Sequence, residues 1–104
     1  MKNRISLSKL DEQQAEGALC VAVMALRDAE EARRFLRDLC TPAELQALVD
    51  RWRVVGLLRA GLTYRQINEQ TGISVTTIGR VARFLADGNG GYLAVAERLD
   101  GEDS

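Results

Sequence analysis

The sequence predicts an all-α protein that folds as a single domain. Alanine, leucine, arginine and glutamate are abundant, the chain has one proline, and there is little alternation of β-branched with polar residues, which favours helices over strands. With 104 residues, of which 46% are hydrophobic, the chain has the length and composition of one globular domain. Such a chain can bury about two-thirds of the surface that it exposes when unfolded.

The first helix is expected from Lys9 to Arg27, after residues 1–8, which are polar and basic and which we expect to form a flexible arm. From Leu19 onward this segment is apolar on every side, and a monomer of this size has too little interior to surround it. Gly17 costs the helix about 1 kcal/mol relative to alanine, and close approach of a partner helix would explain a glycine there. We therefore expect a second subunit to pack against this helix.

Two further helices follow. Asp28, with Glu31 three residues later, is an N-cap pattern for a second helix that should end near Cys40. The segment 41–44, TPAE, is the clearest helix start in the chain, because proline loses no hydrogen bond at the first helical position and glutamate faces the positive end of the helix dipole. This third helix should reach Ala60. Its apolar stripe, which we expect to be buried, consists of Leu45, Leu48, Val49, Trp52, Val55 and Leu58.

Residues 63–84 are predicted to form a helix-turn-helix. Thr63 and Gln66 make a capping-box pattern that starts a short helix. Gly72 ends it, because glycine adopts the left-handed backbone conformation of a sharp turn at no steric cost. Asn68 departs from the usual motif, which has a small residue at that point. An ordinary helical hairpin in another all-α protein is the alternative, since short glycine turns between amphipathic helices are common.

The second helix of this motif has the character of a recognition helix. Ser74 can cap it, and it should run to Phe84. The apolar residues expected to pack the two helices together are Ile67, Ile73, Val75, Ile78 and Val81. The residues expected to remain exposed are Ser74, Thr76, Thr77, Gly79, Arg80 and Arg83. Small polar residues near the helix start can approach base edges in the major groove, while arginines near its end reach phosphates or guanine.

The charge is segregated along the chain. Residues 51–86 carry six arginines and one acidic residue, Glu69, although the net charge of the chain is −1. This positive block coincides with the helix-turn-helix, as a DNA-facing surface requires. The alternative is that the arginines only solvate helix faces. The last helix is expected from Tyr92 to Leu99, so that the domain covers residues 9–99 and an acidic tail covers residues 100–104.

The composition excludes several kinds of chemistry. The chain has no histidine, which removes imidazole catalysis and histidine-based metal sites. Cys20 and Cys40 are too few and too far apart for a zinc site, and we expect buried free thiols rather than a disulfide. The sequence also lacks a glycine-rich phosphate-binding motif. We therefore expect that the protein is not an enzyme and binds no metal and no cofactor. No segment approaches 18 uninterrupted apolar residues and no leader is evident, so we expect a soluble cytoplasmic protein with no membrane partner.

Residues 39–85 resemble the Trp repressor family. The TPxE helix start, the pair Arg51 and Arg53, the LLRAG helix end and the helix-turn-helix occur in the same order and with nearly the same spacing. The TY, TGIS and GNGGY segments are more similar to the short Trp-repressor-related bacterial proteins than to the tryptophan-sensing repressor. The resemblance implies an intertwined six-helix homodimer whose recognition helices enter successive major grooves about 34 Å apart.

The resemblance also implies a ligand pocket. In the repressor an indole lies between two arginines, beside a threonine, and a glycine and a serine of the recognition helix leave room for it. Thr41, Arg51 and Arg80 match the threonine and the arginines, but Val81 and Phe84 stand at the glycine and serine positions. We expect these larger side chains to fill the slot, so that tryptophan is not the corepressor. The two arginines could instead hold the carboxylate of another effector, form salt bridges or contact phosphates.

The positions that match DNA contacts of the family lie on both helices of the motif. They are Arg65, Asn68, Ser74, Val75, Thr76, Thr77 and Gly79, to which the exposed cations Arg80 and Arg83 are added. We expect Arg65 to fix the phosphate register, Thr76 and Thr77 to touch bases, and Val75 to meet a thymine methyl group or a water-bridged base.

We interpret the chain as a transcriptional repressor that acts as a homodimer on a pseudo-palindromic operator in double-stranded DNA. The alternative is a dimeric protein–protein interaction module that has the same fold and no strong affinity for DNA. Salt dependence separates the two, because binding through several phosphates weakens steeply as salt rises, whereas an apolar protein interface need not weaken.

Overall fold

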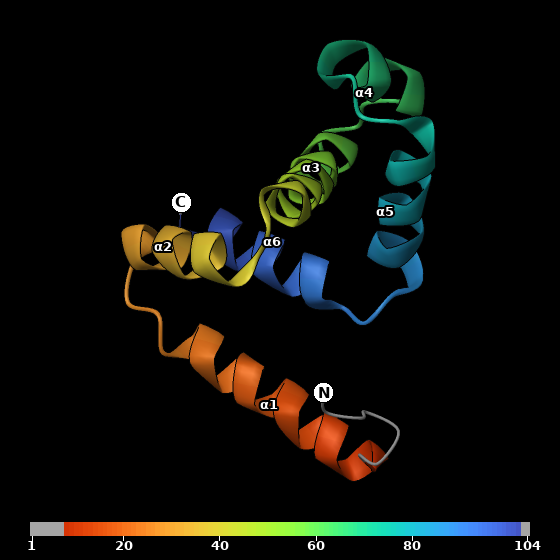
Figure 1. Cartoon of the computed structure of the whole chain (residues 1–104). Coiled ribbons are helices and arrows are strands. Elements are labelled where there is room, and N and C mark those ends of the chain that lie inside the picture. The colour runs from red at the N-terminus through yellow and green to blue at the C-terminus, as the bar shows by residue number, and fades with distance from the viewer. Residues whose placement is uncertain (1–7, 103–104) are drawn as a thin grey trace. The chain divides into compact units, whose positions relative to one another are not determined.

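The computed structural model describes residues 8–102, which contain six α-helices and no strand (Figure 1). The predicted all-α class is therefore confirmed. The chain divides into two units, residues 1–41 and residues 42–104. Residues 1–7 of the expected N-terminal arm and residues 103–104 of the expected tail lie outside the described part of the chain.

The first unit contains α1 (Lys9–Met24) and α2 (Ala29–Leu39). α1 begins with an unpredicted capping box. The Oγ of Ser8 accepts a hydrogen bond from the Asp11 amide at 3.1 Å, and the Ser8 amide donates to the Asp11 carboxylate at 3.3 Å. The helix ends at Met24, before the predicted end at Arg27.

Neither α1 nor α2 contains a buried residue. Val21 is 69% exposed and Met24 is 85% exposed, although both are apolar. Cys20 is likewise exposed, while Cys40 is half-buried, and both are free thiols. The prediction that both cysteines are buried is therefore wrong, because α1 buries none of its faces within this chain.

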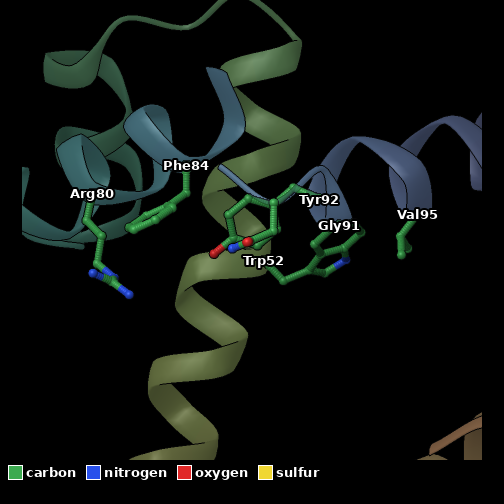
Figure 2. Close-up of a pocket in the computed structure, with 7 residues that line it drawn as sticks. Trp52, Arg80, Phe84, Gly91, Tyr92 and Val95 are labelled. Carbon is green, nitrogen blue, oxygen red and sulfur yellow. The ribbon is translucent and has the colours of Figure 1, made fainter. Parts of the chain in front are cut away.

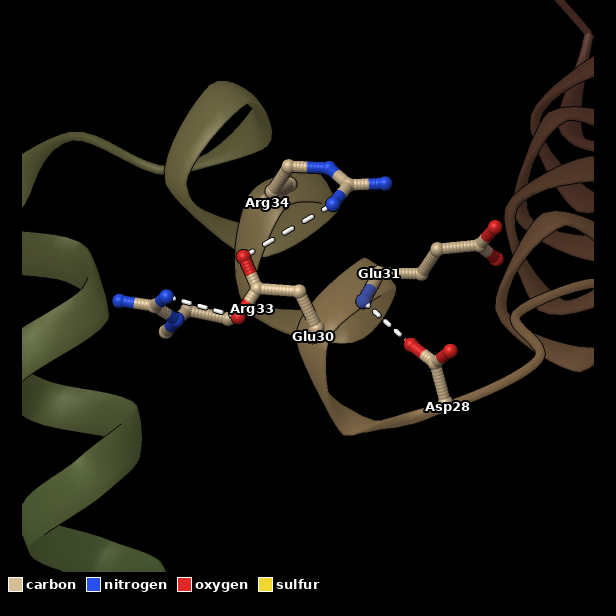
Figure 3. Close-up of polar contacts among 5 residues, drawn as sticks. All are labelled: Asp28, Glu30, Glu31, Arg33 and Arg34. Atoms are coloured by element: carbon tan, nitrogen blue, oxygen red, sulfur yellow. Dashed lines mark hydrogen bonds and ion pairs between the residues drawn. The ribbon is translucent and has the colours of Figure 1, made fainter.

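The start of α2 confirms the predicted N-cap. The Oδ1 of Asp28 accepts a hydrogen bond from the Glu31 amide at 2.8 Å (Figure 3). Within the helix, Glu30 pairs with Arg33 at 2.7 Å and with Arg34 at 3.7 Å. All of these side chains are more than half exposed, so the ion pairs contribute little to stability.

The second unit contains α3 (Pro42–Arg59), α4 (Tyr64–Thr71), α5 (Val75–Asp87) and α6 (Gly91–Glu102). α3 packs against each of the other three helices, and α5 packs against α4 and α6 (Figure 1). The buried residues of this unit are Val54, Val55, Ile67, Ile73, Ile78, Val81 and Ala96. α6 runs beyond its predicted end at Leu99, so the first residues of the expected acidic tail are helical.

The buried face of α3 differs from the predicted stripe. Val55 is fully buried as expected, but so is Val54, which the stripe did not include. Val49 and Trp52 are 51% and 40% exposed, and Leu48 is exposed as well. The prediction that Trp52 belongs to the core is therefore wrong for the single chain. α4, α5 and α6 pack against α3 but leave the Val49 and Trp52 side chains partly uncovered.

Candidate nucleic-acid interface

The first helix of the motif, α4, starts as the sequence predicts. The Oγ1 of Thr63 accepts a hydrogen bond from the Gln66 amide at 3.1 Å, and the Thr63 amide donates to the Gln66 side chain at 2.8 Å. Gly72 ends the helix with φ of 76°, in the left-handed conformation that glycine adopts readily. Both the capping box and the glycine turn are confirmed.

The turn between α4 and α5 also contains side-chain hydrogen bonds. The Nδ2 of Asn68 donates to the Ile73 carbonyl at 2.9 Å. The Oγ1 of Thr71 donates to the Ile67 carbonyl at 2.7 Å and accepts from the Ile73 amide at 3.0 Å. Asn68 was expected to contact DNA, and the structure shows that its amide group bonds within the turn.

The second helix of the motif, α5, is capped by Ser74. The Oγ of Ser74 accepts a hydrogen bond from the Thr77 amide at 3.1 Å and donates to the Thr77 hydroxyl at 3.0 Å. Ile78 and Val81 face the core and are fully buried. Val75, the first residue of α5, is 54% exposed, so its predicted place between the two helices is wrong.

The outer face of α5 carries the side chains expected to meet DNA. Ser74, Thr76, Arg80 and Arg83 are exposed, while Thr77 and Gly79 are half-buried. A shallow hollow of about 410 Å³ lies along this face and is lined by Thr76, Gly79, Arg80 and Arg83. On α4, the guanidinium of Arg65 is exposed and pairs with Glu69 at 3.1 Å. This surface therefore combines a small, polar helix start with three exposed cations.

A second hollow, of about 520 Å³, lies between α3, α5 and α6 (Figure 2). It is lined by Trp52, Arg80, Phe84, Asn89, Gly91, Tyr92 and Val95. The guanidinium carbon of Arg80 lies 4.6 Å from the centre of the Phe84 ring, a cation–π distance. The rings of Trp52 and Tyr92 lie 6.4 Å apart at 42°. Arg80 and Phe84 were both predicted at a pocket, but Trp52, Tyr92, Asn89, Gly91 and Val95 were missed.

The sequence contained a partial signal for the missed residues. Trp52 belongs to the apolar stripe of α3, and Tyr92 opens the first turn of α6, but only the packing of α3 against α6 brings their rings together. Three of the predicted pocket residues, Thr41, Arg51 and Val81, do not line this hollow. Val81 is fully buried in the core of the unit, and Arg51 is half-buried elsewhere on α3.

The model of one protein family, described as Trp repressor protein, matches residues 14–100. The chain belongs to the Trp repressor family. Within residues 8–102, no three side chains of the metal-binding types come together, and none of the helices is long and apolar enough to cross a membrane.

Members and neighbours of the Trp repressor family match most of the chain. YerC of Bacillus subtilis, an uncharacterised protein, is 44% identical over 78 residues, which are 75% of each chain. A TrpR-like protein from Eubacterium eligens has a crystal structure with a TM-score of 0.74 and 41% identity, over 94% of this chain and 96% of that one. A candidate Trp repressor from Staphylococcus aureus has a TM-score of 0.79 and 37% identity, over 84% and 87% of the two chains.

Membership of the Trp repressor family confirms the six-helix fold and makes the chain a DNA-binding regulator in general terms. It leaves the role of each residue as a prediction. The geometry of α5 shows where the residues at two positions of the family's ligand pocket lie in this chain. At the two positions where the repressor has small residues, Val81 is packed into the core and the Phe84 ring lies against Arg80.

Proposed function

We propose that the protein is a transcriptional repressor that binds a pseudo-palindromic operator as a homodimer and without tryptophan. The proposal rests on the small polar and cationic side chains exposed on the outer face of α4 and α5. The first turn of α5 presents Ser74 and Thr76, whose side chains are small and exposed, and such a turn can lie against base edges in the major groove. Arg80 and Arg83 follow along the same helix, where cations can reach phosphates or guanine.

The electrostatics of α4 suit contact with the DNA backbone. The side chain of Arg65 is 87% exposed and pairs with Glu69, one turn away on the same helix, at 3.1 Å. An exposed pair of this kind is weak, so a phosphate can replace the carboxylate at little cost. Arg65 can thereby fix the position of α5 along the groove, while Thr76 and Thr77 contact the bases.

The exposed apolar side chains support a homodimer. α1 exposes Leu19, Val21, Val23 and Met24, and α3 and α6 expose Val49, Trp52, Leu93, Val95 and Leu99. Each of the two units thus leaves several large apolar side chains exposed, and clustered exposed apolar residues mark interaction surfaces. A second copy of the chain can cover these residues by two-fold symmetry, which also presents two recognition helices to the two halves of a palindrome.

The contact between Phe84 and Arg80 supports independence from tryptophan. In the repressor an arginine at the position of Arg80 stacks on the indole. Here a ring that belongs to the chain already lies against that guanidinium, at 4.6 Å. An indole in the same place would have to displace the Phe84 side chain.

The proposal is tested by selecting bound fragments from a random pool of duplexes with the purified protein at near-physiological salt, with and without tryptophan. The expected result is an enriched palindrome that is the same in both pools, and affinity for it that falls steeply as salt rises. Enrichment only with tryptophan would contradict the proposal that DNA binding is independent of tryptophan. No enrichment from a stable dimer would instead support the protein-interaction module, which has the same fold.

A further inference from the structure

The residue that leads into the recognition helix is held on both sides of its backbone by side chains of α4. Ile73 stands between the left-handed Gly72 and the N-cap Ser74. Its amide donates to the Thr71 hydroxyl at 3.0 Å, and its carbonyl accepts from the Asn68 amide at 2.9 Å. Both backbone groups are thereby paired in a partly buried turn, where an unpaired group would be costly.

The two side chains that bond to Ile73 are themselves held in the last turn of α4. The Thr71 hydroxyl that accepts from Ile73 also donates to the Ile67 carbonyl at 2.7 Å, which fixes the direction of its proton. The Gly72 amide donates to the Asn68 carbonyl at 2.8 Å. The Ile73 side chain is buried, and Ile67 is fully buried in the same core. Ile73 therefore cannot shift relative to α4 without losing two hydrogen bonds and apolar packing.

The chemistry of Asn68 limits what else it can do. A carbonyl only accepts hydrogen bonds, so the group that faces Ile73 must be the Asn68 NH₂. The other polar atom of this side chain, Oδ1, is an acceptor and cannot bond to a phosphate oxygen, which is itself an acceptor. One amide proton is left for any contact outside the turn.

We propose that Asn68 and Thr71 form a clamp on the Ile73 backbone that sets the angle between α4 and α5, and that Asn68 acts on DNA binding as a positioning residue. The inference rests on the proposed function, because it assumes that α5 contacts DNA. It explains a polar residue where the motif usually has a small one. The clamp prepares the recognition helix before DNA arrives, and so reduces the ordering that binding would otherwise require.

The test uses the full chain with Asn68→Ala, Thr71→Val and the double variant. Thr71→Val removes the hydroxyl but keeps the shape, and Thr71→Ser should restore the clamp. Each single variant is expected to weaken binding to the selected operator by about 5-fold, as loss of one hydrogen bond implies. Because the two residues hold the amide and the carbonyl of one residue, Ile73, the double variant should lose much less than the product of the two single effects. Multiplicative losses would overturn the shared clamp.

A direct DNA contact by Asn68 gives a different pattern. In that case Asn68→Ala would weaken binding while Thr71→Val would not, and this result would also overturn the proposal. Asp28→Ala is the matched control for stability, since it removes a single N-cap hydrogen bond of α2 outside the motif. If it lowers the melting temperature as much as the clamp variants and weakens DNA binding equally, the effect is one of stability and the positioning role fails.

A second measurement tests for the clamp in the absence of DNA. Amide hydrogen exchange at Ile73 in the free protein should be faster in Thr71→Val and return to the original rate in Thr71→Ser. Unchanged exchange in Thr71→Val would refute the clamp, whatever the protein binds. Absence of DNA binding by the unaltered chain would refute the proposed function and with it the positioning role, while the exchange rates would still show whether the clamp exists.

Discussion

The guanidinium carbon of Arg80 lies 4.6 Å from the centre of the Phe84 ring, one turn further along the recognition helix. Arg83 approaches the same ring at 5.6 Å. A cation over an aromatic face is attracted by the ring quadrupole, by about 0.5–1 kcal/mol at exposed sites. One aromatic side chain therefore restricts both arginines of α5 that we expect to meet DNA.

Replacing Phe84 with leucine should weaken operator binding by about 2- to 5-fold, because the arginines lose the ring while an apolar side chain of similar size is kept. Phe84→Tyr retains an aromatic face and should bind like the original protein. Affinities measured by fluorescence anisotropy at one salt concentration check this. Equal affinity of all three proteins would show that the stacking has no part in DNA binding.

Replacing Arg65 with alanine should weaken binding to all DNA sequences alike and flatten the dependence of log affinity on log salt by about one unit, since one phosphate contact is lost. Glu69→Gln should have the opposite effect on affinity, because the carboxylate 3.1 Å from Arg65 then no longer competes with phosphate. Titrations at several salt concentrations test both changes. An unaltered slope in Arg65→Ala would place this residue away from the backbone.

Thr77→Ala should cost about 1–3 kcal/mol of binding energy on the preferred operator and nothing on unrelated DNA. The substitution also removes the bond between the hydroxyls of Ser74 and Thr77, but the N-cap bond from the Thr77 amide remains. Thr76→Ala, at the exposed neighbouring position, is the comparison. Competition between operator and random duplex is the measurement, and an unchanged sequence preference would refute the role assigned to Thr77.

The two glycines of the motif should respond in opposite ways to alanine. Gly72 has φ of 76° and open space where a Cβ would stand, so Gly72→Ala should lower the free energy of unfolding by about 1–2 kcal/mol through backbone strain alone. At Gly79, inside α5, a Cβ would stand 3.9 Å from a Tyr64 ring atom, which is ordinary contact. Gly79→Ala should therefore stabilise the fold by about 0.5–1 kcal/mol. Urea unfolding measures both, and equal destabilisation would contradict the assignment of the turn.

Trp52 is the single tryptophan of the chain and is 40% exposed in the isolated subunit. If a second copy covers α3, its fluorescence should lie at shorter wavelength in the dimer and shift to longer wavelength on dilution. Val49→Glu, on the same exposed side of α3, should produce the shifted spectrum at all concentrations and a monomer in sedimentation. A spectrum independent of concentration, from a protein that sediments as a monomer, would refute the proposed dimer.

The sequence alone determined where the two helices of the motif begin and the turn between them, although α5 runs to Asp87, beyond its predicted end at Phe84. The bonds of Thr63 with Gln66, the cap of Ser74 and the left-handed Gly72 were all predictable, because each depends on residues within a few positions of one another. The positive block over residues 51–86 is also a property of the sequence alone, and the assignment of α5 as the recognition helix stays a prediction that rests on it.

Only the tertiary structure decided which faces of these helices are covered. Burial depends on contacts between segments far apart in the chain, so periodicity placed Trp52 and Val75 in the core although both are exposed, and it missed Val54. The rings of Trp52 and Tyr92 meet because α3 packs against α6. The bond from Asn68 to Ile73 exists because the turn folds the chain back on α4. Local rules predict where a helix begins and ends, whereas the partner of each side chain depends on how the helices pack.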